Sequence, residues 1–256
     1  MIFDTHAHYD DSVYDKDREA VFRLIKSEGV TMVTNIGSDI ESTKSSIRLS
    51  EDFDFIYAAA GVHPSEVYSL KESDMDFLSE AATHPKVVAI GEIGLDYHYE
   101  DTVREVQKKW FVRQLNIAKE TKLPVVIHSR DAAQDTLDIL KAEHAEEIGG
   151  VIHCFSYGWD MAKIYLDMGF YLGIGGVVTF KNAKKLKEVV QKAPLERLVL
   201  ETDAPYLAPE PYRGKRNASH YLKYVINEIA ALRNLIPEEV VLITEDNGKR
   251  MYRIAY

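Results

Sequence analysis

Short runs of apolar and β-branched residues recur along the chain, and each is followed by a segment in which apolar residues return at helical spacing. This alternation restricts the possible folds more than any other feature. The expected strands are residues 2–6, 30–36, 55–62, 87–93, 124–128, 150–155, 170–176 and 198–203. Two further helices are expected at the end of the chain, at 219–234 and 237–252, with Pro237 in the first turn of the second.

Eight strands alternating with helices over 256 residues predict an α/β protein with a (β/α)8 TIM barrel, because an open doubly wound sheet usually has fewer strands. Residues 6–11 read HAHYDD and lack the glycines of a dinucleotide-binding turn. No low-complexity linker or repeat interrupts the pattern. We therefore expect residues 1–256 to form a single barrel domain.

The charge balance limits the partners that the chain can attract. It has 41 acidic and 31 basic residues and a formal net charge of −10, so it has no bulk attraction for nucleic acid or an anionic membrane. An anionic substrate would need local positive charge. Arg213, Lys215 and Arg216 form one such group, for which solvated loop charge is the alternative.

The sequence also predicts a cellular setting. Cys154 is the only cysteine, which excludes an internal disulfide and favours a reducing compartment. No export signal opens the chain, and no apolar run approaches the roughly 20 residues of a membrane helix. We expect a cytoplasmic protein without a membrane partner. The oligomeric state is left open, and a monomer is compatible with the sequence.

Two histidines, His6 and His8, close the first expected strand. Residues two apart on a strand point to the same face, and at the end of a barrel strand that face is the mouth where active sites form. Other histidines and carboxylates end or follow later strands, namely His63, Glu92, His128, His153 and Asp203. Each alone could serve a turn or a loop. Burying them together without a cation would cost on the order of several kcal/mol per ion.

A dinuclear metal centre resolves this conflict. Six nitrogen and oxygen donors exceed the three protein ligands of a typical mononuclear zinc enzyme. The predicted metal ligands are His6, His8, Glu92, His128, His153 and Asp203. Glu92 is the predicted bridge, with His6, His8 and Asp203 completing the first site and His128 and His153 completing the second. Zinc, manganese and magnesium all suit these donors.

Other residues near the expected mouth are candidates for catalysis or substrate binding. Glu201 shares the parity of Asp203 and is predicted to hold a third ion or to orient water, with a structurally hydrogen-bonded buried carboxylate as the alternative. For His63 and Arg130 we predict contacts to a phosphate, although His63 could instead orient a ligand and Arg130 could form a structural ion pair. Tyr206 is a candidate for stacking on a base, with loop packing as the alternative.

Six motifs at or near the ends of the expected strands carry a family resemblance. They are THAH at 5–8, GVHP at 61–64, GEIGLD at 91–96, IHSRDA at 127–132, HCFS at 153–156 and ETDAPYL at 201–207. Together they resemble the TatD family of metal-dependent DNases and hydrolases, within the amidohydrolase superfamily, and they span nearly the whole chain. The first motif places the chain in the branch with an N-terminal His-x-His. The family usually has RGKRNEP and HCFSG where this chain has RGKRNASH and HCFSY, so the loop after the last strand and the pocket shape depart from it.

The resemblance implies a two-metal deoxyribonuclease, similar to a 3′–5′ exonuclease, that cleaves phosphodiester bonds of DNA. In the predicted reaction a metal-activated water attacks phosphorus, and Asp203 accepts its proton. Glu92 and Glu201 are the other predicted catalytic residues. The same centre could instead hydrolyse a lactone, an amide or a phosphotriester, because it determines water activation better than it determines the electrophile. A non-catalytic ligand-binding barrel is a third, remoter hypothesis.

Overall fold

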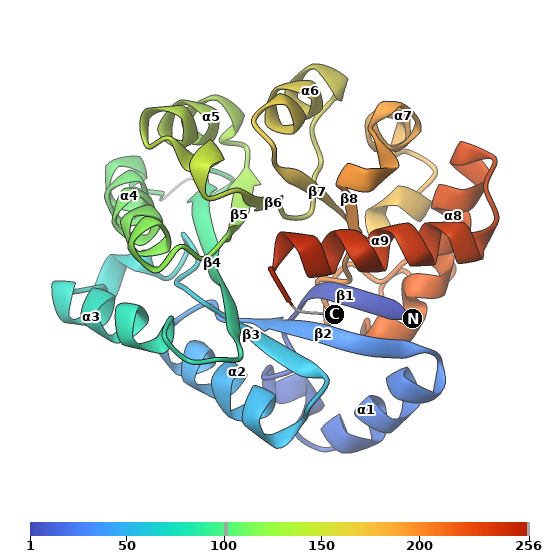
Figure 1. Ribbon diagram of the computed structural model, residues 1–256, viewed down its shortest axis with the longest axis horizontal. Coiled ribbons are helices and arrows are strands. Elements are labelled where there is room, and N and C mark those ends of the chain that lie inside the picture. Colours follow the sequence, from blue (N-terminus) through green and yellow to red (C-terminus); the bar gives the residue numbers. More distant parts are fainter. Residues whose placement is uncertain (100–101, 255–256) are drawn as a thin grey trace.

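The computed structural model describes residues 1–99 and 102–254, which form a ring of strands surrounded by helices (Figure 1). One sheet of eight parallel strands runs in chain order from β1 to β8, which confirms the predicted (β/α)8 barrel. The strands are β1 Ile2–Ala7, β2 Val30–Ile36, β3 Ile56–Ala60, β4 Val87–Asp96, β5 Val125–Arg130, β6 Gly150–Ile152, β7 Tyr171–Ile174 and β8 Leu198–Leu200.

Amphipathic helices cover the outside of the barrel. They are α1 Arg18–Ser27, α2 Ile40–Asp52, α3 Glu72–Ala81, α4 Arg104–Thr121, α5 Ala133–Ala142, α6 Trp159–Asp167, α7 Lys184–Lys192, α8 Leu222–Arg233 and α9 Pro237–Met251. Local signals explain some of their boundaries. Asp39 accepts a hydrogen bond from the backbone of Ser42 at the start of α2, and Pro237 opens α9. No helix among the described residues is long and apolar enough to cross a membrane.

The last helix closes the end of the barrel where the strands begin. Figure 1 shows α9 lying across β1 and β8. Met251 at its end and the following Tyr252 join a buried cluster with Phe3, Val126 and Val199. Because this end is filled with apolar side chains, polar chemistry is confined to the opposite end, where the strands finish.

The barrel closes at that opposite end through irregular backbone rather than a continuous ladder. The strand expected at 198–203 stops at Leu200, and the residues that follow pair with the end of β1. The backbone N–H of Asp203 donates to the carbonyl of His6, and the N–H of His8 donates to Ala204. Asp203 has a left-handed φ of 57°, which turns the chain out of the strand. These bonds hold the ends of β1 and β8 together.

Strands β4 and β6 also differ from their expected lengths. β4 continues three residues beyond the expected 93, because Gly94, Leu95 and Asp96 pair with the end of β5. β6 ends at Ile152 instead of 155, and Cys154 then has a left-handed φ of 44°. As a result Glu92 lies inside its strand, whereas His153 follows the end of its own strand.

Candidate metal centre

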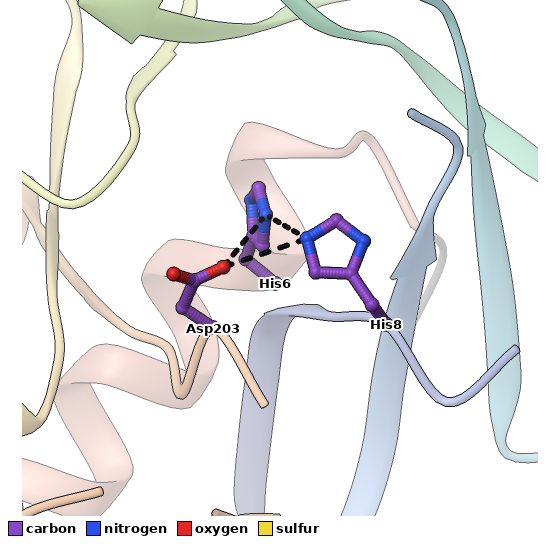
Figure 2. A group of neighbouring side chains, drawn as sticks. All are labelled: His6, His8 and Asp203. Carbon is purple, nitrogen blue, oxygen red and sulfur yellow. Dashed lines mark hydrogen bonds and ion pairs between the residues drawn. The ribbon is translucent and has the colours of Figure 1, made fainter. Parts of the chain in front are cut away.

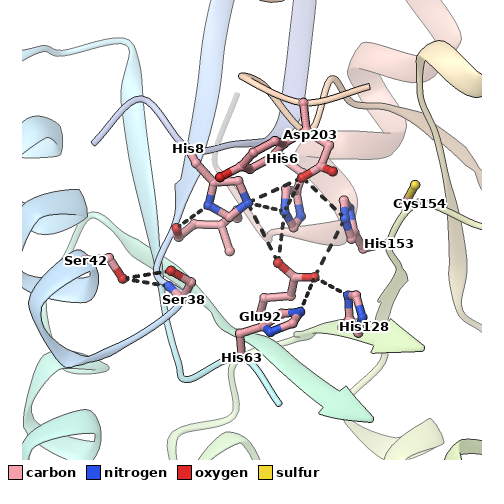
Figure 3. Close-up of polar contacts among 12 residues, drawn as sticks. His6, His8, Ser38, Ser42, His63, Glu92, His128, His153, Cys154 and Asp203 are labelled. Carbon is pink, nitrogen blue, oxygen red and sulfur yellow. Dashed lines mark hydrogen bonds and ion pairs between the residues drawn. The ribbon is translucent and has the colours of Figure 1, made fainter. Parts of the chain in front are cut away.

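The six predicted metal ligands meet at the end of the barrel where the strands finish (Figure 3). They come from the end of β1, from β4 and β5, and from the segments after β6 and β8. A cavity of about 890 Å³ opens above them, lined by five of the six and by rim residues. His6 lies deeper, with 1% of its surface exposed.

The carboxylate of Glu92 lies between two groups of imidazoles. Its Oε2 is 3.4 Å from Nε2 of His6 and 3.8 Å from Nε2 of His8. Its Oε1 is 2.7 Å from Nδ1 of His128 and 3.8 Å from Nε2 of His153. Each oxygen therefore faces a different pair of nitrogens, which is the arrangement that a bridging carboxylate needs.

Asp203 completes the first group (Figure 2). Its Oδ1 is 3.4 Å from Nε2 of His8 and 3.7 Å from Nε2 of His6, and it is also 3.7 Å from Nε2 of His153. The Asp203 side chain is 18% exposed, more than those of His6 and His8, and it borders the cavity. The carboxylate therefore contacts the predicted ligands while remaining open to a reactant.

This donor set fits divalent cations. Nδ1 of His8 lies 3.0 Å from the carbonyl of Ile36, which only accepts, so in the neutral ring the inward Nε2 is a lone pair. Nε2 of His8 lies 3.1 Å from Nε2 of His6. The ring of His6 in turn stacks on that of His153, with centroids 3.4 Å apart. Electron-pair donors that converge on carboxylate oxygens repel one another unless a proton or a metal ion lies between them.

Without metal, protons take the place of cations. Burial lowers the pKa of His8, but the carboxylate of Asp203 outweighs it and raises that pKa to about 9. Burial likewise opposes the charged form of His153, yet Glu201 and Glu92 raise its pKa to about 10. Burial acts to raise the pKa of Glu92, but His153 and His6 hold it well below its usual value. At neutral pH the Glu92 carboxylate is therefore ionised and the rings of His8 and His153 are charged, whereas burial and the charge of His153 lower the pKa of His6.

Metal binding should consequently release protons and tighten as the pH rises. The pKa of His8 is about 9 and that of His153 about 10, so both must lose a proton before they bind metal at lower pH. Each such proton makes the apparent affinity rise by about tenfold per pH unit below that pKa. Zinc titrations by calorimetry between pH 6 and 8, in buffers of different ionisation enthalpy, would count the released protons. A zinc affinity independent of pH would contradict the prediction that His8 and His153 lose protons when they bind metal.

His63 differs from the other imidazoles because, in its neutral form, it turns an N–H group and not a lone pair toward the centre. The backbone N–H of Ser65 donates to its Nδ1 at 3.1 Å, so in the neutral ring Nε2 carries the proton. That nitrogen faces Glu92 Oε1 at 3.9 Å. Burial, followed by the charge of His128, lowers the pKa of His63 to about 4. Although its position would also suit a ligand beside Glu92 and His128, the geometry favours a neutral hydrogen-bond donor.

The other predicted substrate contacts lie on the rim of the cavity. Arg130 lines it, and its guanidinium is 5.9 Å from the ring centroid of Tyr99. Tyr206 and Tyr99 also line it and are 55% and 56% exposed. Several acids share this rim, namely Asp10, Asp11, Asp39 and Glu66. Arg130 is the only lysine or arginine of the described chain in the lining.

The basic group after the last strand is partly occupied by structural contacts. Arg216 forms an ion pair with Asp17 at 2.6 Å and lies over the ring of Tyr14, and Arg213 lies over the ring of Phe180. Their guanidinium groups are thus held against this chain's own residues, a structural role that differs both from attraction of a substrate and from the solvated loop charge given as the alternative.

Glu201 is fully buried and does not line the cavity. Its Oε2 is 3.1 Å from Nδ1 of His153, and its Oε1 accepts a hydrogen bond of 2.6 Å from the backbone N–H of Cys154. Both oxygens have partners, so the geometry favours the hydrogen-bonded alternative over a third ion or a water-orienting role. β8 ends at Leu200, so Glu201 lies just beyond the strand, where its carboxylate, His6 and His153 have ligand atoms within 4.8 Å of one another.

Asp96 is a residue of the site that the sequence reasoning missed. Its Oδ2 lies 3.1 Å from Nε2 of His128, on the side of the ring opposite Glu92. The signal was present, because Glu92 and Asp96 lie four residues apart and so share a strand face. It went unused because the strand was expected to end at 93, three residues before Asp96.

Comparisons with known proteins point to one family. The family model of the TatD related DNases matches residues 3–253. The metal-dependent hydrolase YabD of Bacillus subtilis, itself described as uncharacterized, is 47% identical over 99% of this chain and 100% of its own length. A protein of a Rahnella species named 3′-5′ ssDNA/RNA exonuclease TatD is 31% identical, over 99% of both chains.

A solved structure supports the fold. The crystal structure of YJJV, a TatD homologue from Escherichia coli, superposes with a TM-score of 0.94 and 30% identity, covering 99% of this chain and 98% of that one. The family model and the relatives span almost the entire sequence. The chain therefore belongs to the TatD family of metal-dependent hydrolases.

Proposed function

We propose that this hydrolase cleaves phosphodiester bonds of DNA with two divalent cations. The observation that carries the proposal is the position of Glu92, whose two oxygens face different groups of nitrogen donors. Paired metal ions that share a carboxylate are typical of enzymes that displace oxygen at phosphorus. The similarity to a protein named as a single-stranded DNA and RNA exonuclease supports the same substrate class.

The cations would supply a water molecule of lowered pKa and neutralise charge on the phosphate oxygens. The chain's own residues would do the rest. Burial acts to raise the pKa of Asp203. The hydrogen bond from His8 and the charges of His153 and His6 outweigh burial and lower that pKa below its usual value, so the carboxylate is ionised and can accept a proton. The Nε2–H of neutral His63 would donate to a phosphate oxygen, and Arg130 would hold a second one.

The rim favours the end of a single strand over a long duplex. Tyr99 and Tyr206 expose more than half of their surface beside the cavity, where a base can stack on each ring. The rim acids repel further phosphates, so that few of them can approach at once. We therefore propose 3′–5′ exonuclease-like removal of terminal nucleotides.

A small uncharged substrate is the second candidate, and the acidic rim favours it. The four rim carboxylates, Asp10, Asp11, Asp39 and Glu66, outnumber the single guanidinium of the described lining and give a poor approach for a polyanion. A lactone, an amide or a phosphotriester would avoid this repulsion and use the same activated water.

An assay on matched substrates separates these functions. Single-stranded and duplex DNA labelled at either end would be tested beside a lactone, an amide and a phosphotriester, with and without chelator. We expect shortening of single strands from the 3′ end, abolished by chelator and restored by Mg²⁺, Mn²⁺ or Zn²⁺. Chelator-sensitive turnover of a small substrate alone would transfer the proposal to the second candidate. Absence of any chelator-sensitive turnover would support a ligand-binding barrel.

A further inference from the structure

Two buried carboxylates outside the predicted ligand set contact two of the ligands at the ring nitrogen that faces away from Glu92. Asp96 lies 3.1 Å from Nε2 of His128, and Glu201 lies 3.1 Å from Nδ1 of His153. Their own exposed fractions are 3% and 0%. Both of these histidines belong to the second proposed ion site. The histidines of the first site have no such support, because His8 is backed by a carbonyl and Nδ1 of His6 has no partner among the described residues.

The two carboxylates are built in the same way. In each, one oxygen faces the ring nitrogen and the other accepts a backbone N–H, from His98 to Asp96 and from Cys154 to Glu201. Backbone N–H groups only donate, so each carboxylate is held in a fixed orientation. Its remaining oxygen then requires a proton on the ring nitrogen that faces it. The opposite ring nitrogen becomes a lone pair directed at the centre.

The local backbone makes room for this arrangement. A Cβ atom at Gly173, on β7, would collide with the carboxylate of Glu201, so glycine allows that side chain to lie against the neighbouring strand. Asp96 is fixed by a further bond, from its backbone N–H to the side chain of Gln107 on α4 at 2.9 Å. Both carboxylates are thus placed by the fold and do not depend on a bound ion for their position.

We propose that Asp96 and Glu201 are positioning residues that impose opposite tautomers on the two histidines of the second ion site. Asp96 keeps the proton of His128 on Nε2 and directs Nδ1 to the metal, whereas Glu201 keeps the proton of His153 on Nδ1 and directs Nε2 to it. This inference rests on the ligands of the proposed function but not on its substrate. Among the described residues, neither carboxylate has a hydrogen bond to His6, His8 or Asp203, the ligands of the first ion site other than the bridge.

The variants Asp96→Asn and Glu201→Gln test this directly. An amide has only one oxygen, so it cannot accept from both the backbone and the ring, and its NH₂ group faces one of the two donors. We expect each variant to bind one zinc ion about 10–100-fold more weakly and the other as the wild type does. Calorimetric titration with Zn²⁺ measures both affinities. Glu245→Gln, which alters a buried carboxylate on α9 paired with the chain's N-terminus, is the matched control.

Nitrogen-15 spectra of the histidines in the zinc-loaded full chain give a readout independent of turnover. In the wild type, we expect the ring proton on Nε2 of His128 and on Nδ1 of His153. Gly173→Ala should displace the Glu201 carboxylate without altering its charge, and it should weaken binding of the ion held by His128 and His153. Wild-type zinc affinities in both amide variants, equal weakening of both ions, or identical tautomers for the two histidines would overturn the inference. A wild type that binds no zinc would instead contradict the proposed function itself.

Discussion

Replacing Glu92 with Gln should reduce kcat/KM by at least about 1000-fold, equivalent to about 4 kcal/mol of transition-state stabilisation. The reason is its shared position, since its two oxygens face the two groups of imidazoles separately. A neutral amide removes a negative charge from both proposed ion sites and turns one acceptor into a donor. Hydrolysis should therefore fail even when metal is in excess.

Thermal unfolding provides a second measurement for the Glu92 variant. A cation present at 100 times its Kd stabilises the folded state by about 2.7 kcal/mol, which raises Tm by roughly 5–10 °C in a chain of this size. We expect the wild type and Glu245→Gln to show this increase and Glu92→Gln to lose most of it. A Glu92→Gln variant with wild-type activity and a full metal-dependent rise in Tm would refute the bridging role.

Replacing Asp203 with Asn should lower kcat by about 100- to 10,000-fold, the usual contribution of a general base. The carboxylate is ionised, borders the cavity and lies within 3.7 Å of His6, His8 and His153. The amide retains the shape of the side chain but cannot accept the proton. The effect on kcat should exceed the effect on KM, because the proton moves only in the transition state.

Asp203 is also a predicted metal ligand, so the two roles have to be separated. Turnover of Asp203→Asn should be measured at saturating Mn²⁺ or Zn²⁺, with the bound metal counted in the same sample. Asp11→Asn is a suitable control, because Asp11 borders the same cavity without contacting the predicted ligands. Turnover at the wild-type rate in a fully loaded Asp203→Asn sample would exclude the role as base.

The barrel was predictable because its signals are local and repeated. Residues 30–36 were expected as a strand and form one, and Pro237 opens α9 as expected. The strand ends were harder to predict, because they depend on neighbouring strands that periodicity does not describe. β4 continues to Asp96 because β5 continues beside it, and β8 stops at Leu200 because the next residues bond to β1.

The same limit applies to the candidate site. The convergence of the six predicted ligands followed from their places near strand ends and from a family resemblance. What the sequence could not give is which ring nitrogen faces the centre. That depends on the outer partner of each ring, such as Ser65 for His63, Asp96 for His128 and Glu201 for His153. Such contacts are set by tertiary geometry, which parity along one strand does not determine.

The most direct test of the metal centre is a crystal structure of the zinc- or manganese-loaded protein with anomalous scattering recorded at the metal edge. We expect two anomalous peaks, one on each side of the Glu92 carboxylate. One should lie beside His6 and His8, and the other between His128 and His153. Histidine and carboxylate side chains that converge as described but show no anomalous peak at saturating metal would contradict the account.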